Sequence, residues 1–573
     1  MEQGKPMIPL SFGQERLWYH EQTLGGSPVY NMAFSYELTG KLDLKILEES
    51  LKVIIKRHDI LRTYFVKAEG KPVQAVRPEI DFFLDITNLQ ELPIKEKEKR
   101  AYELALEESE TPFNLTKAPL WRFKLLQLDS EKSVLLVTIH HIICDHWSLS
   151  ILMQELATIY QDIAAGQNVS LPPLARQYGE FTLWQNQWLE GKKNQKQLAY
   201  WEEKLGGKVS PLVLPFDQPP SPLANYQGKR QLIVLSKELT SQLKALSEEA
   251  GVTLFMTLLT GFKSVLYQYT RQEDMIVCSP IAGRHRRETK GLMGYFNNII
   301  PLRTDLSGDP SFSGLLKRVS QTALKGYQNM DLPFQKIANL PNLKRVPLTR
   351  AMFALQHSPS DEIQLSNLTI GYPNFQHVHN GTANFELSLF LEEREGSVTG
   401  VLDYKTALFE PTTIEEMVDN FVSLLESSVT NPERKLSSLP ILRDIQPREQ
   451  TQVTITDTPY VAPEKEVEQK IAQVWQEVLQ VEKISLHHNF FELGGNSLAI
   501  AQVTTQLQEI FKQEISIVDL FSYPTVKTLA QYLSQEEEPC NTQFKIIQNN
   551  VNQQKQARQR RKQLMKQRRN NHG

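Results

Sequence analysis

The stretch His140–His146, HHIICDH, gathers three histidines and a carboxylate within seven residues. Histidine is the side chain best suited to proton transfer near neutral pH, and a carboxylate such as Asp145 can orient an imidazole or hold the loop in shape. Imidazole and carboxylate are also metal ligands. However, adjacent side chains at a strand end point to opposite faces, so His140 and His141 are poorly placed to share one ion. A structural pair of histidines is the third interpretation.

A second stretch, NFFELGGNSLAIAQV over 489–503, places Ser497 after a flexible Gly-Gly-Asn turn and at the start of an amphipathic helix. Serine is a favoured helix N-cap, so the pattern is compatible with an ordinary helix start. A helix N-terminus also stabilises a phosphate on that serine, because its free amides and dipole favour negative charge. The residues alone leave both interpretations open, and the second predicts a phosphodiester-linked prosthetic group.

Helices and strands that alternate along the chain must position these groups. The run SVLLVTIH, 133–140, predicts a buried strand, and 148–163 predicts the helix that follows it. The histidines therefore fall on a loop between strand and helix, where side chains can face a cleft. Apolar spacing predicts further helices over 42–58 and 253–270, and a strand near 274–284.

The composition changes near residue 443. Residues 443–462 are polar with no apolar period and predict a linker, and the following ~75 residues predict a small bundle of three or four helices. From Gln535 onward the chain is rich in Gln, Asn, Lys and Arg, which predicts disorder or a lone exposed helix.

Overall composition excludes several classes of protein. The chain has 573 residues, 40% hydrophobic and 23% charged, which is typical of a large globular protein and excludes a disulfide-stapled mini-protein. No window approaches the ~18 apolar residues of a membrane-spanning helix, so we expect no membrane association. We see no secretory signal, and three scattered cysteines with no CxxC pair favour a reducing cytoplasm. We therefore expect a cytoplasmic protein.

The net charge of −3 hides an asymmetry, because residues 551–573 carry eight Lys and Arg and no acidic residue. The bland interpretation is a solvated, partly helical tail. A sharper one is a docking element that recruits an acidic segment of a downstream synthase. Nucleic-acid binding is the least favoured, because the flanking sequence predicts no fold for it.

Taken together, these stretches resemble nonribosomal peptide synthetases. HHIICDH looks like the HHxxxDG motif of their condensation domains, and the resemblance extends over roughly 8–445. The stretch around Ser497 resembles the xFFxLGGxSL attachment motif of peptidyl carrier domains. The condensation segments that carry the likeness are, in order, LSFGQERLWYHEQ, RHDILRTYF, QYGEFTLWQNQWL, YWEEKLGG, QEDMIVCSPIAGR, GLMGYFNNIIPLRTDLSGDPSF, NMDLPFQKI and MFALQ.

The resemblance implies a fold. It is an α/β condensation domain of two lobes, each like chloramphenicol acetyltransferase, which meet in a V with a tunnel between them, followed by an all-α four-helix carrier. The expected boundaries are 1–180 for the N-lobe, 181–445 for the C-lobe, 446–461 for the linker, 462–537 for the carrier and 538–573 for the basic, disordered or docking tail.

The resemblance also implies roles for residues. His141 would take the proton of the attacking amine or orient that amine, with His140 in support, and no metal is involved. Asp145 would pair with Arg284 and hold the loop. Ser497 would carry 4′-phosphopantetheine.

One position departs from the family pattern, since His146 stands where the family has glycine. Glycine adopts positive φ readily and permits a close backbone approach, and histidine does both less readily. Three interpretations stay open. The loop tolerates His146, or His146 narrows the tunnel or adds a titratable group that changes substrate choice, or the domain is weakened or inactive. The carrier motif departs mildly at His488, where aspartate is common.

The implied function is condensation of an upstream carrier-bound acyl or peptidyl thioester with the amine of an aminoacyl group on Ser497. The length leaves no room for an adenylation domain, so we expect a separate adenylation enzyme to act in trans. Further expected partners are a phosphopantetheinyl transferase, an upstream donor carrier and a downstream synthase module. The order of domains argues against epimerisation. The alternatives are ester formation with a hydroxyl acceptor, and a silent platform that recruits enzymes to the carrier.

Overall fold

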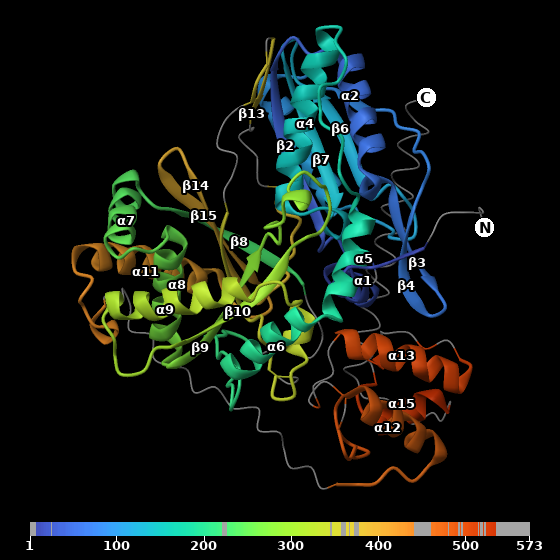
Figure 1. The fold of residues 1–573 in the computed structure, drawn as a ribbon, viewed down its shortest axis with the longest axis vertical. Coiled ribbons are helices and arrows are strands. Elements are labelled where there is room, and N and C mark those ends of the chain that lie inside the picture. Colours follow the sequence, from blue (N-terminus) through green and yellow to red (C-terminus); the bar gives the residue numbers. More distant parts are fainter. Residues whose placement is uncertain are drawn as a thin grey trace. The chain divides into compact units, whose positions relative to one another are not determined.

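The computed structural model divides into two compact units, a large one over Met1–Thr456 with Gly494–Gln502 and a small one over Asp457–Leu493 with Val503–Gly573. Figure 1 shows the fold of each unit. The structure describes residues 7–24, 26–219, 226–343, 346–356, 363–365, 367–371, 378–439, 460–479, 481–490, 493, 497–513, 515, 519–520 and 523–534.

The first half of the large unit is built on a six-stranded sheet in which β7 is central. Every residue of β7 after Lys132 is buried, which explains its continuous apolar sequence and confirms the predicted strand. β7 runs antiparallel to β2 and ends at His140, opposite Asn31. The strands, in sheet order, are β12 (Ile363–Gln364), β13 (Leu368–Gly371), β2 (Asn31–Gly40), β7 (Lys132–His140), β6 (Trp121–Gln127) and β5 (Asp85–Asn88).

Helices and a small second sheet complete this half. The predicted amphipathic helix is confirmed as α2, whose start is capped by Asp43 and whose apolar stripe is buried. The helices are α1 (Phe12–Leu24), α2 (Leu44–Arg57), α3 (Ile94–Glu110), α4 (His146–Ala164) and α5 (Tyr178–Leu189), with short 3₁₀ turns η1 (Asp59–Arg62) and η2 (His141–Ile143). The small sheet has the order β1 (Ile8–Pro9), β4 (Lys71–Val76), β3 (Thr63–Ala68).

The second half is built on another six-stranded sheet, which α7, α8, α9 and α11 contact. The predicted helix over 253–270 and the strand after it are confirmed as α8 and β9. The strands, in sheet order, are β10 (Asn298–Asp305), β9 (Asp274–Ile281), β11 (Ala351–Gln356), β14 (Leu387–Arg394), β15 (Ser397–Lys405) and β8 (Gly228–Val234). The helices are α6 (Lys192–Lys204), α7 (Lys237–Glu249), α8 (Leu254–Thr270), α9 (Phe312–Gln328), α10 (Phe334–Ala338) and α11 (Pro411–Thr430), with 3₁₀ turns η3 (Arg287–Thr289) and η4 (Leu436–Ser438).

The chain crosses between the two sheets after β11. The strands β12 and β13 come from the second half of the sequence, yet they extend the first sheet, with Leu368 paired to Gly40 of β2. Gly40 has a φ of 120°, and a Cβ there would lie 2.2 Å from the carbonyl oxygen of Asn367. Only glycine therefore permits this approach of the crossing segment. The crossing joins the two halves through backbone pairing.

The C-terminal region of the chain is helical, with α12 (Glu466–Leu479), α13 (Ser497–Phe511) and α15 (Val526–Leu533). Its core holds the fully buried Trp475 and Phe490, whose ring centroids are 4.8 Å apart. The predicted helices of this region are confirmed. The tail 538–573 and most of the predicted linker lie outside the described residues.

None of the described helices alone combines the length and the apolar character that a membrane span requires. The pair α7 and α8 meets those requirements only when the two are joined across a bend of 107°. Nearly every residue of α8 is buried inside the large unit, as expected for a core helix.

Candidate active site and carrier attachment site

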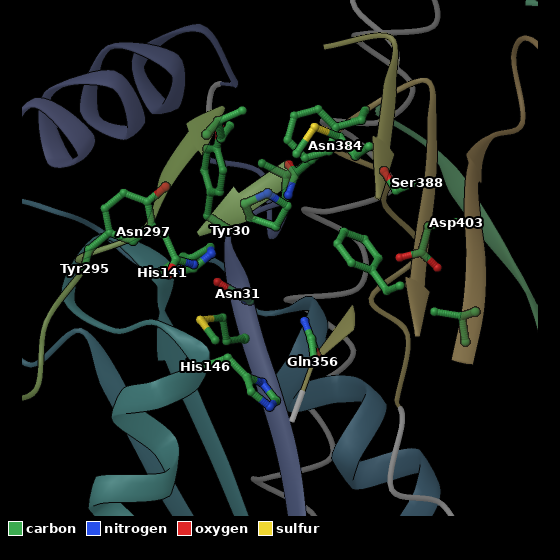
Figure 2. Close-up of a pocket in the computed structure, with 18 of the residues that line it drawn as sticks. Tyr30, Asn31, His141, His146, Tyr295, Asn297, Gln356, Asn384, Ser388 and Asp403 are labelled. Atoms are coloured by element: carbon green, nitrogen blue, oxygen red, sulfur yellow. The ribbon is translucent and has the colours of Figure 1, made fainter. Parts of the chain in front are cut away.

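A cavity of about 1600 Å³ lies in the large unit. Its walls come from both halves, with α1, β2 and α4 on one side and β8, β14 and β15 on the other. Figure 2 shows His141 beside Tyr295 and His146 farther along the cavity, with Ser388 and Asp403 on the strands of the second sheet. The predicted loop between strand and helix therefore does face a cleft.

His141 is held in one tautomer by the turn on which it lies. Its Nδ1 is 2.6 Å from the backbone carbonyl oxygen of Cys144. A carbonyl oxygen only accepts hydrogen bonds, so Nδ1 carries the proton and donates. In the neutral ring Nε2 is then an acceptor. The backbone amide of His141 also donates to the carbonyl of Tyr30 at 2.9 Å, which fixes the turn.

The surroundings of His141 keep its imidazole neutral. Burial lowers its pKa to about 4, although the Cys144 carbonyl and the charge of Asp145 act in the opposite direction. The ring of Tyr295 packs edge-on against the imidazole, with centroids 4.9 Å apart. His141 is therefore a neutral, oriented hydrogen-bond acceptor that lines the cavity.

His140 points the other way, into the core of the first half. Its side chain is buried, and its ring lies 6.0 Å from the ring of Tyr30 and 6.1 Å from that of Phe113. Its Nδ1 accepts from the amide of Ile142 at 3.1 Å, which places the proton on Nε2. That Nε2 is 3.7 Å from a carboxylate oxygen of Glu21. The structure thus separates the two adjacent histidines, as strand geometry leads one to expect.

Asp145 and Arg284 form a buried ion pair directly behind the turn that carries His141. Arg284 Nη2 lies 2.8 and 3.1 Å from the two carboxylate oxygens of Asp145. The other guanidinium nitrogen, Nη1, donates to the carbonyls of Thr289 and Leu292. The pair holds the turn in place and lies outside the reacting space, which fits a structural role.

The carboxylate of Asp145 also caps α4. It accepts from the amide of Ser148 at 2.8 Å, from the hydroxyl of Ser148 at 2.6 Å, and from the amide of Phe296 at 3.1 Å. The cap moves the start of the helix to His146, two residues before the predicted start. Sequence reasoning did not single out Ser148. The signal was there, since an Asp followed three residues later by Ser is a capping pattern.

His146 is the first residue of α4 and lines the cavity. It has helical backbone geometry and does not belong to the residues with positive φ, so the fold places no demand for glycine here. Its ring lies 6.0 Å from the ring of Phe34 on β2. Burial lowers the pKa of His146, whereas the charges of Asp145 and Glu392 act to raise it. His146 therefore differs from the glycine of the family motif in the space that its imidazole fills, and not in its backbone conformation.

A further histidine of the cavity wall, His20, was missed by sequence reasoning. His20 on α1 lies between two tyrosine hydroxyls, with Nδ1 2.6 Å from that of Tyr30 and Nε2 2.6 Å from that of Tyr226. Burial, together with the charges of Arg16 and Lys405, lowers the pKa of His20 to about 4. Nothing in the spacing of His20 could have indicated this contact, because Tyr226 is 206 positions away.

In the C-terminal region of the chain, α13 begins at Ser497. A helix start at this residue offers free amides and a positive dipole end to an attached phosphate, so the position fits the phosphodiester of phosphopantetheine. The side chain of Ser497 and the residues Gly494–Asn496 lie outside the described part of the chain. As for metals, no group of three or more His, Cys, Asp or Glu within the described residues could hold an ion.

Comparison with known proteins gives this geometry a family. Residues 5–451 match the condensation domain family model. The chain belongs to the condensation domain family. Residues 469–533 match the phosphopantetheine attachment site model, so a carrier domain follows the condensation domain and phosphopantetheine is its prosthetic group.

Individual relatives agree with this assignment. The condensation and carrier protein is 38% identical over 481 residues to a linear gramicidin synthase of Brevibacillus parabrevis, across 82% of this chain and 6% of that one. It is 34% identical over 439 residues to phosphinothricin tripeptide synthetase PhsC of Streptomyces viridochromogenes, across 76% of this chain and 40% of that one. The chain therefore spans a small part of these synthetases.

Among solved structures, the X-domain from teicoplanin biosynthesis is similar with a TM-score of 0.68 and 25% identity, over 77% of this chain and 99% of that one. The first condensation domain of the calcium-dependent antibiotic synthetase, in complex with a substrate analogue, has a TM-score of 0.67 at 17% identity, over 77% and 100% of the chains. The expected fold class is confirmed.

Proposed function

We propose that this protein lengthens a nonribosomal peptide by forming an amide bond on its own carrier domain. The amine of an aminoacyl group held at Ser497 attacks the carbonyl carbon of an upstream acyl or peptidyl thioester. The carbon–nitrogen bond forms, the carbon–sulfur bond of the donor breaks, and the proton that the amine loses ends on the departing thiolate of the donor carrier. The oriented, neutral His141 in the cavity is the observation that carries this proposal.

The role of His141 follows from its tautomer. With the proton fixed on Nδ1, Nε2 can accept a hydrogen bond from the attacking amine. With a pKa of about 4, the imidazole of His141 is too weak a base to deprotonate a free ammonium group. It is better suited to orient a neutral amine and to take its proton as the new bond forms. His140 supports the turn from behind, and the Asp145–Arg284 pair keeps it in register.

The carrier domain supplies the acceptor. When bound at Ser497, phosphopantetheine supplies a flexible arm with a terminal thiol that carries the aminoacyl group as a thioester. We infer that a phosphopantetheinyl transferase modifies Ser497 and that a separate adenylation enzyme loads the amino acid in trans. The support is that the two matched segments, 5–451 and 469–533, are a condensation domain and an attachment site, neither of which activates amino acids.

The remaining expectations stay part of the proposal. They are an upstream donor carrier, a downstream synthase module that docks on the basic tail, and a cytoplasmic location. The proposed boundaries are 1–180 and 181–445 for the two lobes, 446–461 for the linker, 462–537 for the carrier and 538–573 for the tail.

The test is the mass of the acyl group on the peptide that contains Ser497, in the full chain reconstituted with transferase, adenylation enzyme and a loaded donor carrier. The wild type should carry a condensed acyl-aminoacyl group. His141→Ala should carry mainly the single monomer, with the rate reduced roughly 10²–10⁴-fold. Ser497→Ala is the control that should carry nothing. A wild type and a His141→Ala protein that carry the same single monomer would overturn the proposal.

The likeness to the X-domain supports a second candidate. One of the similar structures is a complex of the X-domain with OxyB, at 24% identity and a TM-score of 0.66. By analogy, this domain would be a catalytically silent platform that recruits enzymes to the loaded carrier. The mass experiment separates the two, because a platform needs Ser497 and not His141. A hydroxyl acceptor in place of the amine would give an ester, and alkaline lability of the product would reveal it.

A further inference from the structure

Two large apolar side chains on β8 are exposed in the wall of the catalytic cavity. Leu232 and Val234 are 65% and 67% exposed, and both line the cavity that holds His141. Phe390 of β14 and Val401 of β15 line it beside them on the same sheet. An exposed apolar strip inside a cavity marks a surface that an apolar partner covers.

The backbone of β8 is also open along one edge. β8 is the last strand of its sheet, and the amide of Leu235 donates to the carbonyl of Val398 on the neighbouring strand at 2.8 Å. Paired and unpaired positions alternate in an antiparallel ladder, so the N–H and C=O groups of Leu232 and Val234 point away from β15. The same alternation explains why the amide of Gly228 donates outward, to Gly381 at 2.9 Å.

Among the described residues, the outer edge of β8 is thus paired at its start only. The segment around Thr382 forms an isolated bridge with Gln227, and beyond Gly228 the described residues give the edge no further backbone partner. Such an edge accepts an extended peptide as an additional strand. Main-chain hydrogen bonds would bind that peptide, and Leu232 and Val234 would contact its side chains.

We propose that β8 binds the donor, as an extended peptidyl chain with apolar side chains that adds a strand to this edge. The inference rests on the proposed function and names the class of substrate for the same site. The assignment to the donor is supported by location, because the apolar strip formed by Leu232 and Val234 lies in the same cavity of about 1600 Å³ as His141.

The length of the strip distinguishes the donor from the acceptor. Leu232 and Val234 are two positions apart, which is ~7 Å along a strand. A single aminoacyl group is too short to react beside His141 and also cover both side chains. The acceptor in the proposed reaction is a single aminoacyl group, whereas a peptidyl donor has the required length.

Hydrogen exchange on the full-length carrier-loaded protein tests this contact without catalysis. The probe is a tripeptidyl pantetheine amide with leucine and valine side chains, which cannot transfer its acyl group. We expect it to slow exchange of the Leu232 and Val234 amides. A tripeptide of serine and asparagine is the matched control and should protect them less. Unchanged exchange with the apolar probe would overturn the inference.

Kinetics supply the second readout. Leu232→Ser should lower kcat/KM for the apolar tripeptidyl donor about tenfold, because it removes roughly half of the apolar contact of a buried leucine, and should lower kcat/KM for an acetyl donor less than that. Val234→Pro should do the same by removing an outward N–H that the ladder to β15 does not use. Ile94→Ser, at a 75% exposed site on α3 outside the cavity, is the control.

The outcomes separate the inference from the proposed function. If the probe protects the two amides but the wild type catalyses no condensation, the result supports the inference and contradicts the proposed function. If condensation occurs and Leu232→Ser changes the rate equally for both donors, the result supports the proposed function and contradicts the inference. Circular dichroism of each variant shows that a lower rate does not come from unfolding.

Discussion

Arg284 holds Asp145 with its Nη2 2.8 and 3.1 Å from the two carboxylate oxygens, and the two residues are 139 positions apart in the chain. Asp145 follows the central strand of the first sheet, and Arg284 follows β9 of the second. Both side chains are almost completely buried. This ion pair therefore connects the turn that carries His141 in one half to a loop of the other half.

Removal of one partner of this pair should be costly. Asp145→Ala leaves a buried guanidinium without its counter-charge and removes the cap of α4, so we expect a loss of about 3–5 kcal/mol in the free energy of unfolding. Urea unfolding followed by circular dichroism measures it. Glu103→Gln, in the exposed Arg100–Glu103 pair, is the control and should cost less than about 1 kcal/mol. Equal losses in the two variants would contradict the structural role.

The size of residue 146 should decide which donors react. His146→Gly removes the imidazole that lies against Phe34 in the cavity wall, and the helical backbone there tolerates the change. We expect the rate with a bulky, branched donor to rise at least ~10-fold, since small steric differences in a pocket discriminate on that scale. The rate with an acetyl donor should stay the same.

A graded series tells size apart from charge. His146→Ala should fall between the wild type and His146→Gly with bulky donors if volume decides the rate. His146→Gln keeps bulk without a titratable ring and should behave like the wild type. An increase in rate for His146→Gln equal to that for His146→Gly would reject the steric explanation.

The sequence predicted those elements whose apolar pattern is local. The stripe of α2 and the continuous run of β7 both appear as expected, because one period and one buried run decide them. The strands β12 and β13 carry no local signal for their sheet, since pairing with β2 depends on a contact between residues about 330 positions apart. The contacts of His20 with two distant tyrosines are of the same kind. Long-range pairing, and not local propensity, thus completes the cavity.

Acid should destabilise the large unit through its buried neutral histidines. Burial holds the pKa of His20 at about 4, whereas the unfolded chain has the ordinary value of 6.5. Between these values the unfolded state binds a proton that the folded state does not, so stability is present above pH 6.5 and is lost as the pH falls towards 4. The expected slope is on the order of 1 kcal/mol per pH unit for each such histidine.

The variant His20→Gln isolates this contribution. It should be less stable than the wild type at pH 7.5, because it disturbs the bonds to Tyr30 and Tyr226, yet lose less stability between pH 6 and 4.5. Urea unfolding at several pH values gives the slopes. Parallel curves for wild type and His20→Gln would show that His20 is not the source.

A buried lysine in the second half should make the stability of the protein depend on pH in the neutral to alkaline range. Lys263 on α8 is fully buried and donates to the carbonyls of Met275 at 3.3 Å and Leu302 at 2.8 Å. Burial lowers its pKa to about 7, against 10.5 in the unfolded chain. Between these values the unfolded state holds the extra proton, so this group makes the wild type more stable as the pH rises from 7 to 10.5.

Lys263→Met removes both the charge and its desolvation cost. We therefore expect the stability of the variant relative to the wild type to be highest at or below pH 7 and to fall as the pH rises towards 10. The two carbonyls left without a donor lower the variant's stability at every pH by ~1–3 kcal/mol each, so the decisive quantity is the change with pH. Lys244→Met, at a partly exposed lysine paired with Glu393, is the control and should show a smaller change. A difference between Lys263→Met and wild type that is constant from pH 7 to 10 would mean that Lys263 stays charged in the folded protein.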